Sequence, residues 1–137
     1  MRSWMLAIKP NLEFSAAVYT MLYQNERCYP TYNRRAIAQD PADWTRQGYL
    51  DVVAPMGYTN DINQWKGWLS CSMRYDVGGA EGIIPIIKFT SNNVQPTTPE
   101  QFRLKIDAIR ELGADGWTIW RYGGPGDYSG IIPDIRE

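Results

Sequence analysis

The side chains in this 137-residue sequence whose types suit chemistry on a ligand lie at the ends of short apolar runs or just after them. One is acidic, two are cationic and the rest are aromatic or amide: Tyr58, Asn60, Asp61, Lys88, Trp120 and Arg121. Asp61 is the carboxylate closest behind a run, which makes it the candidate general acid or base. Tyr58 and Trp120 could stack on a flat ligand, and the two cations could bind an anionic group.

Each of these residues also has a structural interpretation. Asp61 stands directly before a helical pattern, and aspartate is a favoured N-cap residue. Lys88 and Arg121 could instead belong to a structural ion pair inside the fold, because buried charges must be paired. Tyr58 and Trp120 could pack as a lid or in the core. The sequence leaves both interpretations open for each residue.

Composition excludes several classes of chemistry and of partner. The sequence has no histidine, which excludes a Ser-His-Asp or Cys-His system, a His-ligated zinc site and an imidazole proton shuttle. Its 14 basic and 15 acidic residues form no basic patch, so neither nucleic acid nor a membrane is expected as a partner. Cys28 and Cys71 lack the spacing of a zinc or redox motif; they form one disulfide or two free thiols, and two thiols are the simpler expectation. No cofactor and no metal are predicted.

Four apolar runs predict the strands that position the candidate residues: 14–21, 50–58, 82–89 and 116–122. The runs are apolar nearly throughout, which is typical of a parallel sheet covered on both faces. Pro55 and Pro85 lie inside two of them, and proline cannot donate a hydrogen bond to a neighbouring strand. We therefore expect a bulge or an unpaired position at each proline.

Three helical patterns separate the runs, and they span 40–48, 62–73 and 98–113. An aspartate followed by proline starts the first pattern, and a glycine ends it. A Thr-Pro-Glu-Gln capping box starts the third, and Gly113 ends it. Residues 3–10 have the pattern of the end of a further helix.

The predicted strands start at 14, 50, 82 and 116, which gives spacings of 36, 32 and 34 residues. Parallel strands joined by helices build an open wound sheet or a (βα)8 barrel. A full barrel needs about 250 residues, or roughly 31 per unit, so four units make half a barrel. The sequence therefore predicts one α/β domain over 1–137, a half of a TIM-type barrel that is completed by an N-terminal half or by a homodimer.

A tryptophan at 44, a Gly-Tyr-Leu-Asp turn at 48–51 and a Pro-Met-Gly-Tyr sequence at 55–58 follow one another. This order resembles a segment of glycoside-hydrolase-like (βα)8 barrel proteins, in which such a helix and turn lead into strand six. The residues that lead into the first and last runs, 8–10 and 112–116, look similar too. The resemblance aligns the four runs with barrel strands five to eight.

The resemblance implies a domain that hydrolyses or binds polysaccharide or oligosaccharide, often outside the cytoplasm. Glycoside hydrolysis needs two carboxyl groups, and in such barrels one commonly ends strand four, which the four runs do not include. We therefore expect Asp61 to be catalytic, the other five candidates to bind substrate, and an N-terminal half to supply a further carboxylate. Asp51 enters its strand at the opposite end, so we expect it to be structural.

Two alternative functions remain. The domain could bind carbohydrate without catalysis, as a binding or scaffold domain. It could also bind an anion or a phosphate-sugar through Lys88, Arg121 and the glycine-rich loop 123–126. The spacing in that loop matches neither a P-loop nor a dinucleotide fingerprint, and a flexible loop is the simpler interpretation.

Overall fold

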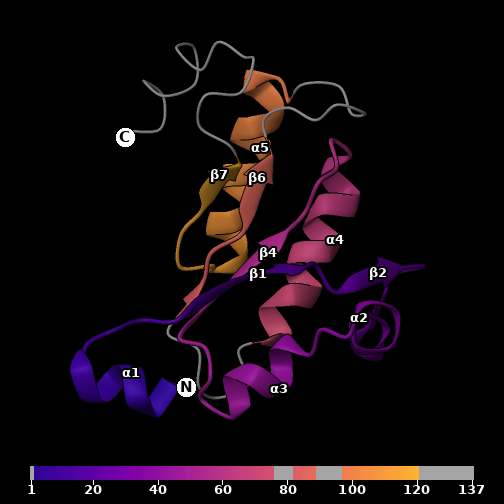
Figure 1. Cartoon of the computed structure of the whole chain (residues 1–137). Helices are drawn as coiled ribbons and strands as arrows, with labels where there is room; N and C mark the ends of the chain where they lie inside the picture. The colour runs from indigo at the N-terminus through magenta and orange to yellow at the C-terminus, as the bar shows by residue number, and fades with distance from the viewer. Residues whose placement is uncertain (1, 76–81, 89–96, 121–137) are drawn as a thin grey trace.

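The computed structural model of the chain describes residues 2–75, 82–88 and 97–120 (Figure 1). The helices and strands follow in this order: α1 (Arg2–Ile8), β1 (Ser15–Tyr19), β2 (Leu22–Gln24), β3 (Arg27–Tyr29), α2 (Pro30–Ile37), α3 (Pro41–Arg46), β4 (Val52–Met56), α4 (Ile62–Ser72), a 3-10 turn (Met73–Tyr75), β5 (Gly82–Ile83), β6 (Ile86–Lys88), α5 (Pro99–Leu112) and β7 (Thr118–Trp120). Every predicted run contains at least one of these strands, and every predicted helical pattern contains a helix.

The main sheet is parallel throughout, with the order β1-β4-β6-β7 and with β5 also paired to β4. In register, Tyr19 lies beside Met56, and Lys88 lies beside Trp120. Because all the strands are parallel and their connections contain helices, the chain is an α/β protein of repeated (βα) units, as the sequence predicts.

Both prolines interrupt pairing at the same place in the sheet. The third predicted strand divides into β5 and β6, and Pro85 lies between them. On the neighbouring strand, Val53 pairs with Ile83 and Met56 pairs with Ile86, so Pro55 falls in the unpaired interval on that side. The expected unpaired positions are therefore confirmed, and Pro85 still accepts a hydrogen bond from the Thr118 N–H through its carbonyl.

Local sequence signals fix the helix boundaries. The Asp40 side chain accepts a hydrogen bond from the Asp43 N–H and caps α3. At α5, Thr98 and Gln101 form the predicted capping box. Gly113 ends that helix with a φ of 72°, a left-handed conformation that glycine adopts without strain.

The hairpin formed by β2 and β3, together with α2, replaces what the sequence suggests is a loop. Two tyrosine-containing strands of three residues carry too little periodicity to be recognised. A disulfide joins Cys28 in β3 to Cys71 in α4, so the expectation of two free thiols is wrong. The pairing depends on the hairpin, because it turns the chain back and brings the two Cα atoms to 5.5 Å.

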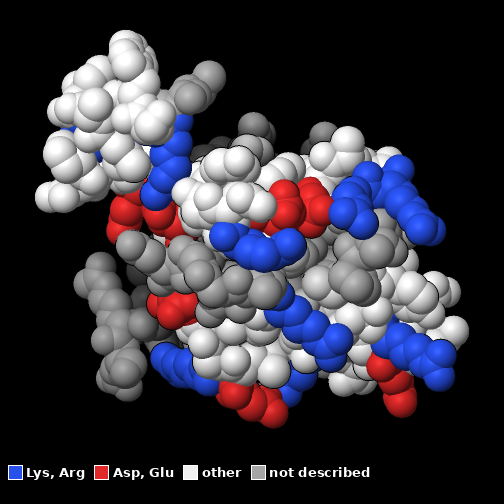
Figure 2. Space-filling view, turned by 90° about the horizontal axis from the view of Figure 1, so that it is seen from below, with Lys and Arg blue, Asp and Glu red and all other residues white. Residues whose placement is uncertain are grey.

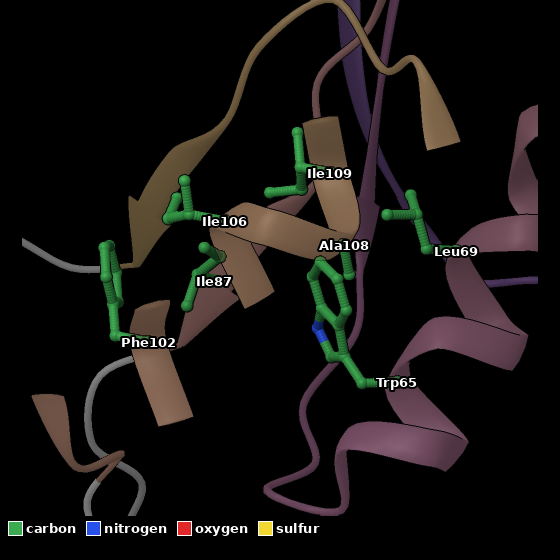
Figure 3. Packing of buried hydrophobic residues seen from close by; sticks show 7 residues of the cluster. All are labelled: Trp65, Leu69, Ile87, Phe102, Ile106, Ala108 and Ile109. Carbon is green, nitrogen blue, oxygen red and sulfur yellow. The ribbon is translucent and has the colours of Figure 1, made fainter. Parts of the chain in front are cut away.

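Two hydrophobic clusters hold the helices against one face of the sheet. The first joins α4, α5 and β6 through Trp65, Leu69, Ile87, Phe102, Ile106, Ala108 and Ile109 (Figure 3). The second joins β1, β4, β5 and α4 through Val18, Met21, Val53, Cys71, Tyr75 and Ile83. Along β1 and β7 the side chains that point to the other face are exposed. On this other face the β4 residues are partly exposed and Ile86 is buried, so among the described residues its exposure is greatest along β1 and β7.

Helix α1 lies apart from these clusters and has no buried residue. Figure 2, which views the molecule from below, shows it as a lobe that stands out from the body with a largely uncharged surface. Arg2 attaches it by donating to both carboxylate oxygens of Asp51, at 2.7 and 2.6 Å. Asp51 also accepts from the Phe14 N–H at 2.8 Å, which confirms its structural role at the amino end of β4.

No helix within the described ranges is long and apolar enough to cross a membrane.

Candidate functional site

The carboxyl ends of the parallel strands bring aromatic and cationic side chains to one edge of the sheet. Tyr19 ends β1, Tyr58 follows β4, Lys88 ends β6 and Trp120 ends β7. Tyr19 and Trp120 expose 55% and 53% of their surface, whereas Tyr58 and Lys88 are half-buried between them. In (βα) barrels this edge is where active sites form.

Lys88 and Tyr58 interact directly. The Lys88 ammonium lies 4.7 Å from the centre of the Tyr58 ring, which is within the range of a cation–π interaction. The lysine therefore reaches over an aromatic face at the sheet edge, and no ion pair to it is seen within the described residues. A ligand that docks at this edge would meet one positive charge beside one aromatic ring.

Tyr19 is a site residue that the sequence-based candidates omit. Burial of Tyr58 raises the pKa of its hydroxyl, and the nearby Tyr19 raises that pKa further, so the two phenols share one region. The backbone carbonyl of Tyr19 accepts a hydrogen bond from Asn33 Nδ2 at 3.0 Å. Its position as the last residue of a strand was the signal for it in the sequence.

Asn60 holds the loop after β4 rather than facing solvent. Its Oδ1 atom lies 3.0 Å from the Thr97 hydroxyl and 3.5 Å from Lys105 Nζ. The Thr97 hydroxyl also lies 2.8 Å from the backbone carbonyl of Lys88, and with its single hydrogen it donates to one acceptor at a time. These contacts tie the loop that bears Tyr58 to the end of β6.

Lys105 is a second residue that the sequence-based candidates miss. It is 1% exposed on the packed face of α5, and desolvation lowers the pKa of its ammonium to about 8. No carboxylate in the described residues pairs with it, and its contact with Asn60 is long. The signal in the sequence was a lysine on the apolar stripe that contains Phe102 and Ile106, where a solvated lysine is not expected.

Asp61 caps α4. Its Oδ1 accepts from the backbone N–H of Asn63 at 2.9 Å and of Gln64 at 3.0 Å, so its structural interpretation is confirmed. The residue is exposed and lies near the same sheet edge as Tyr58. Its catalytic role stays a prediction.

Two further predicted features fall outside the described residues: Arg121 and the glycine-rich loop 123–126. The described part of the chain also holds no group of three or more potential metal ligands.

An apolar hollow lies at the opposite end of the strands. An open, mostly apolar groove of about 580 Å³ separates α1 from the body, and its lining includes Arg2, Leu6, Phe14 and Tyr49. Its walls carry the attachment of α1 and none of the candidate site residues. We therefore assign the candidate site to the carboxyl edge, where position in the fold and side-chain chemistry agree.

Comparisons with known proteins support the fold. No family model matches the chain, and no curated protein matches it. Two solved structures of bee venom hyaluronidase do, and one of them is in complex with a hyaluronic acid tetramer. That complex shares 14% identity with a TM-score of 0.58, and the other structure shares 15% with a TM-score of 0.51.

The match covers 98% of this chain and 46–47% of the hyaluronidase chains, so the chain spans just under half of their length. These neighbours are TIM barrels. The parallel sheet, the helical connections and the neighbours together define the class: the chain has the fold of a partial TIM-type barrel.

Proposed function

We propose that this chain is the substrate-binding half of a carbohydrate-active, glycosidase-like barrel that acts on polysaccharide. The observation that carries the proposal is the cluster at the carboxyl edge, where Lys88 lies over Tyr58 between the exposed rings of Tyr19 and Trp120. Aromatic faces stack on the apolar faces of sugar rings, and a cation beside them suits a sugar that bears a carboxylate. The similarity to a hyaluronidase fold supports the same class of ligand.

Hydrolysis also requires two carboxyl groups on either side of the scissile bond. Asp61 is the acid near the described edge, and capping α4 occupies one of its oxygens. We propose that Asp61 contributes as an acid, base or hydrogen-bond acceptor while the complementary half of the barrel supplies the second carboxylate. The capping role of Asp61 equally favours a second candidate function, a non-catalytic carbohydrate-binding domain.

The disulfide between Cys28 and Cys71 is an indication of the compartment in which the protein functions. Disulfides persist in oxidising compartments and are rare in reducing ones. We propose that the domain functions outside the cytoplasm, because Cys28 and Cys71 are joined.

Isothermal titration with oligosaccharides of hyaluronic acid, cellulose and chitin tests the binding proposal. At least one glycan should give saturable heat, and Trp120→Ala should weaken that binding at least about tenfold, which corresponds to about 1.4 kcal/mol. Trp4→Ala is the matched control, because Trp4 is 70% exposed on α1, away from the site. Absence of binding to every glycan would remove both candidate functions.

Measurement of released reducing ends separates the two candidates. A hydrolase releases product, and Asp61→Asn reduces the rate while binding persists. A binding domain gives heat in the titration and no product. Because a carboxylate from another half-barrel is part of the hydrolase proposal, the assay includes the longest available chain that contains this segment.

A further inference from the structure

The carboxyl end of β1 is held by side chains on the edge that faces away from β4. The Phe14 carbonyl accepts from the Val52 N–H at 3.1 Å, so the hydrogen-bonding groups of Phe14 point toward β4. These groups alternate between the two edges of a strand from one residue to the next, so those of Tyr19 point away from β4. There the Tyr19 N–H donates to Gln39 Oε1 at 3.0 Å, and the Tyr19 carbonyl accepts from Asn33 Nδ2 at 3.0 Å. Side chains therefore close this edge of the sheet at the level of the candidate site.

Asn33 is the centre of this closure. It lies on α2, it is 3% exposed, and its Nδ2 atom also lies 3.0 Å from the Thr20 carbonyl and 2.9 Å from the Tyr75 hydroxyl. The Tyr75 hydroxyl in turn donates to the Tyr19 carbonyl at 3.2 Å. An amide nitrogen carries two hydrogens, so the three acceptors around it share them. The position therefore requires a donor, which Asn33 supplies.

The helix that carries Asn33 is anchored at its beginning. Strand β3 continues directly into α2, and the disulfide joins Cys28 of β3 to Cys71 of α4. In Figure 1, β2 and α2 lie beside the half of α4 that is further from α5. The disulfide thus ties the start of α2 to a helix that packs on the sheet, which keeps Asn33 within reach of Tyr19.

The end of α2 adopts an uncommon conformation that brings the second contact into place. Ala38 follows the helix with a φ of 54°, a left-handed conformation that residues other than glycine rarely adopt. The Gln39 N–H donates to the Asn33 carbonyl at 3.2 Å, and the Gln39 side chain accepts from the Tyr19 N–H. A conformation of this kind persists only where surrounding contacts stabilise it, and the contact with Tyr19 is one of them.

We propose that Asn33 is a positioning residue of the candidate site, which holds Tyr19 in place without contacting the sugar. The inference rests on the proposed function, since it assigns a role within that site. The Tyr19 ring is 55% exposed at the end of a strand, and fixing its backbone beforehand reduces the entropy lost when a ligand stacks on it. Glycan affinity should therefore depend on a buried asparagine that a sugar does not reach.

Hydrogen exchange of the natural chain and of Asn33→Ala, both without glycan, tests the hold on Tyr19. The Tyr19 amide lies at a strand end, where exchange proceeds by local opening, and it should exchange at least about fivefold faster in the variant. An unchanged rate at Tyr19 would overturn the proposal, because Asn33 would then not hold this residue.

A double-mutant cycle tests whether Asn33 acts through Tyr19. Oligosaccharides of hyaluronic acid, cellulose and chitin are the probes, and affinity is measured by isothermal titration. Asn33→Ala should weaken the binding of a glycan that the natural chain binds by about threefold to tenfold. In a Tyr19→Ala chain the same substitution should change affinity by less than about twofold, because the ring that it positions is gone. Equal weakening with and without the Tyr19 ring would overturn the proposal.

Thr45→Val is the matched control for a general loss of stability. Thr45 is fully buried, and its hydroxyl lies 2.7 Å from the Tyr75 carbonyl, so the variant removes a buried polar contact beside the same tyrosine. It should leave the exchange rate of the Tyr19 amide and the glycan affinity within about twofold of the natural chain. Effects as large as those of Asn33→Ala would overturn the proposal. A natural chain that binds none of the three glycans would remove the proposed function instead, whereas the exchange rates decide by themselves whether Asn33 holds Tyr19.

Discussion

At the scale of single residues, the most informative side chain is a lysine that the sequence-based candidates omitted. Lys105 is buried among the apolar residues of α5, and its ammonium lies 3.5 Å from Asn60 Oδ1. Burying an ammonium without a carboxylate partner disfavours its charged form. The burial of the Lys105 ammonium therefore lowers the stability of the fold, although its contact with Asn60 links α5 to the loop that carries Tyr58.

Replacing this lysine by methionine should stabilise the fold. Desolvation lowers the pKa of Lys105 from 10.5 to about 8, so the unfolded chain binds more protons than the folded chain between those two values. The free energy of unfolding of the natural chain should therefore rise with pH between about 8 and 10.5. In Lys105→Met this rise should be absent. At pH 7 the variant should gain up to about 3 kcal/mol in free energy of unfolding.

Urea unfolding at several pH values measures both effects. Lys9→Met is the control, because Lys9 is exposed, and it should leave the pH profile unchanged. If Lys105→Met proved less stable than the natural chain at pH 7, the ammonium would be stabilised by its surroundings and the explanation would be wrong.

Asp51 predicts a rise of stability with pH as well, but in the acid range. The hydrogen bond from Arg2 holds the pKa of Asp51 below its ordinary value of 3.8, against the effect of its burial. The stabilisation is therefore fully present above that value and is lost as pH falls through the folded pKa. Asp51→Asn should lower the free energy of unfolding at neutral pH by about 1.5–3 kcal/mol and weaken the acid dependence.

Chemical unfolding measured at a series of acidic pH values checks this prediction. Asp107→Asn is the matched control, because Asp107 pairs with Arg110 on the exposed surface at 3.7 Å. It should change stability by less than about 1 kcal/mol. Equal effects of the two substitutions would show that α1 is not held by the Arg2 pair.

At the scale of elements, prediction succeeded where a local rule decides the structure. Apolar runs located the four strand positions, and caps such as Thr98 and Gly113 located helix ends. The β2–β3 hairpin was missed because its stability comes from packing on α4, where the Tyr23 ring lies directly against Gly67. The disulfide was missed for the same reason, since nothing local to Cys28 indicates which residue lies opposite it.

The disulfide should be the main stabiliser of this hairpin. It links residues that are 43 positions apart, and a loop of that length gives about 4 kcal/mol in the chain-entropy model. Urea unfolding of the natural chain should therefore shift to lower concentration when a reductant is added. The Cys28→Ala, Cys71→Ala double variant should match the reduced chain and ignore the reductant; a natural chain equally insensitive to reductant would contradict the pairing.

At the scale of the whole molecule, the strand spacing predicted the half-barrel, and the structure confirms the parallel (βα) arrangement. The candidate site was predicted in part. Tyr58, Lys88 and Trp120 share the carboxyl edge as expected, because parallel strands place their ends together. Thr97 could not be assigned from spacing, since its role depends on contacts with Asn60 and the Lys88 carbonyl, whereas Tyr19 and Lys105 had signals in the sequence that the candidate list did not use.

The central claim is that the carboxyl edge of this sheet binds sugar, and nuclear magnetic resonance tests it most directly. Hyaluronic acid tetramer and a neutral glucan oligomer are titrated into the labelled chain, and the signals of individual side chains are followed. The account predicts shifts at the Trp120 indole and the Tyr58 ring with at least one glycan, while the Trp4 indole stays unchanged. Shifts confined to Trp4 and the groove beside α1, or no shifts with either glycan, would contradict it.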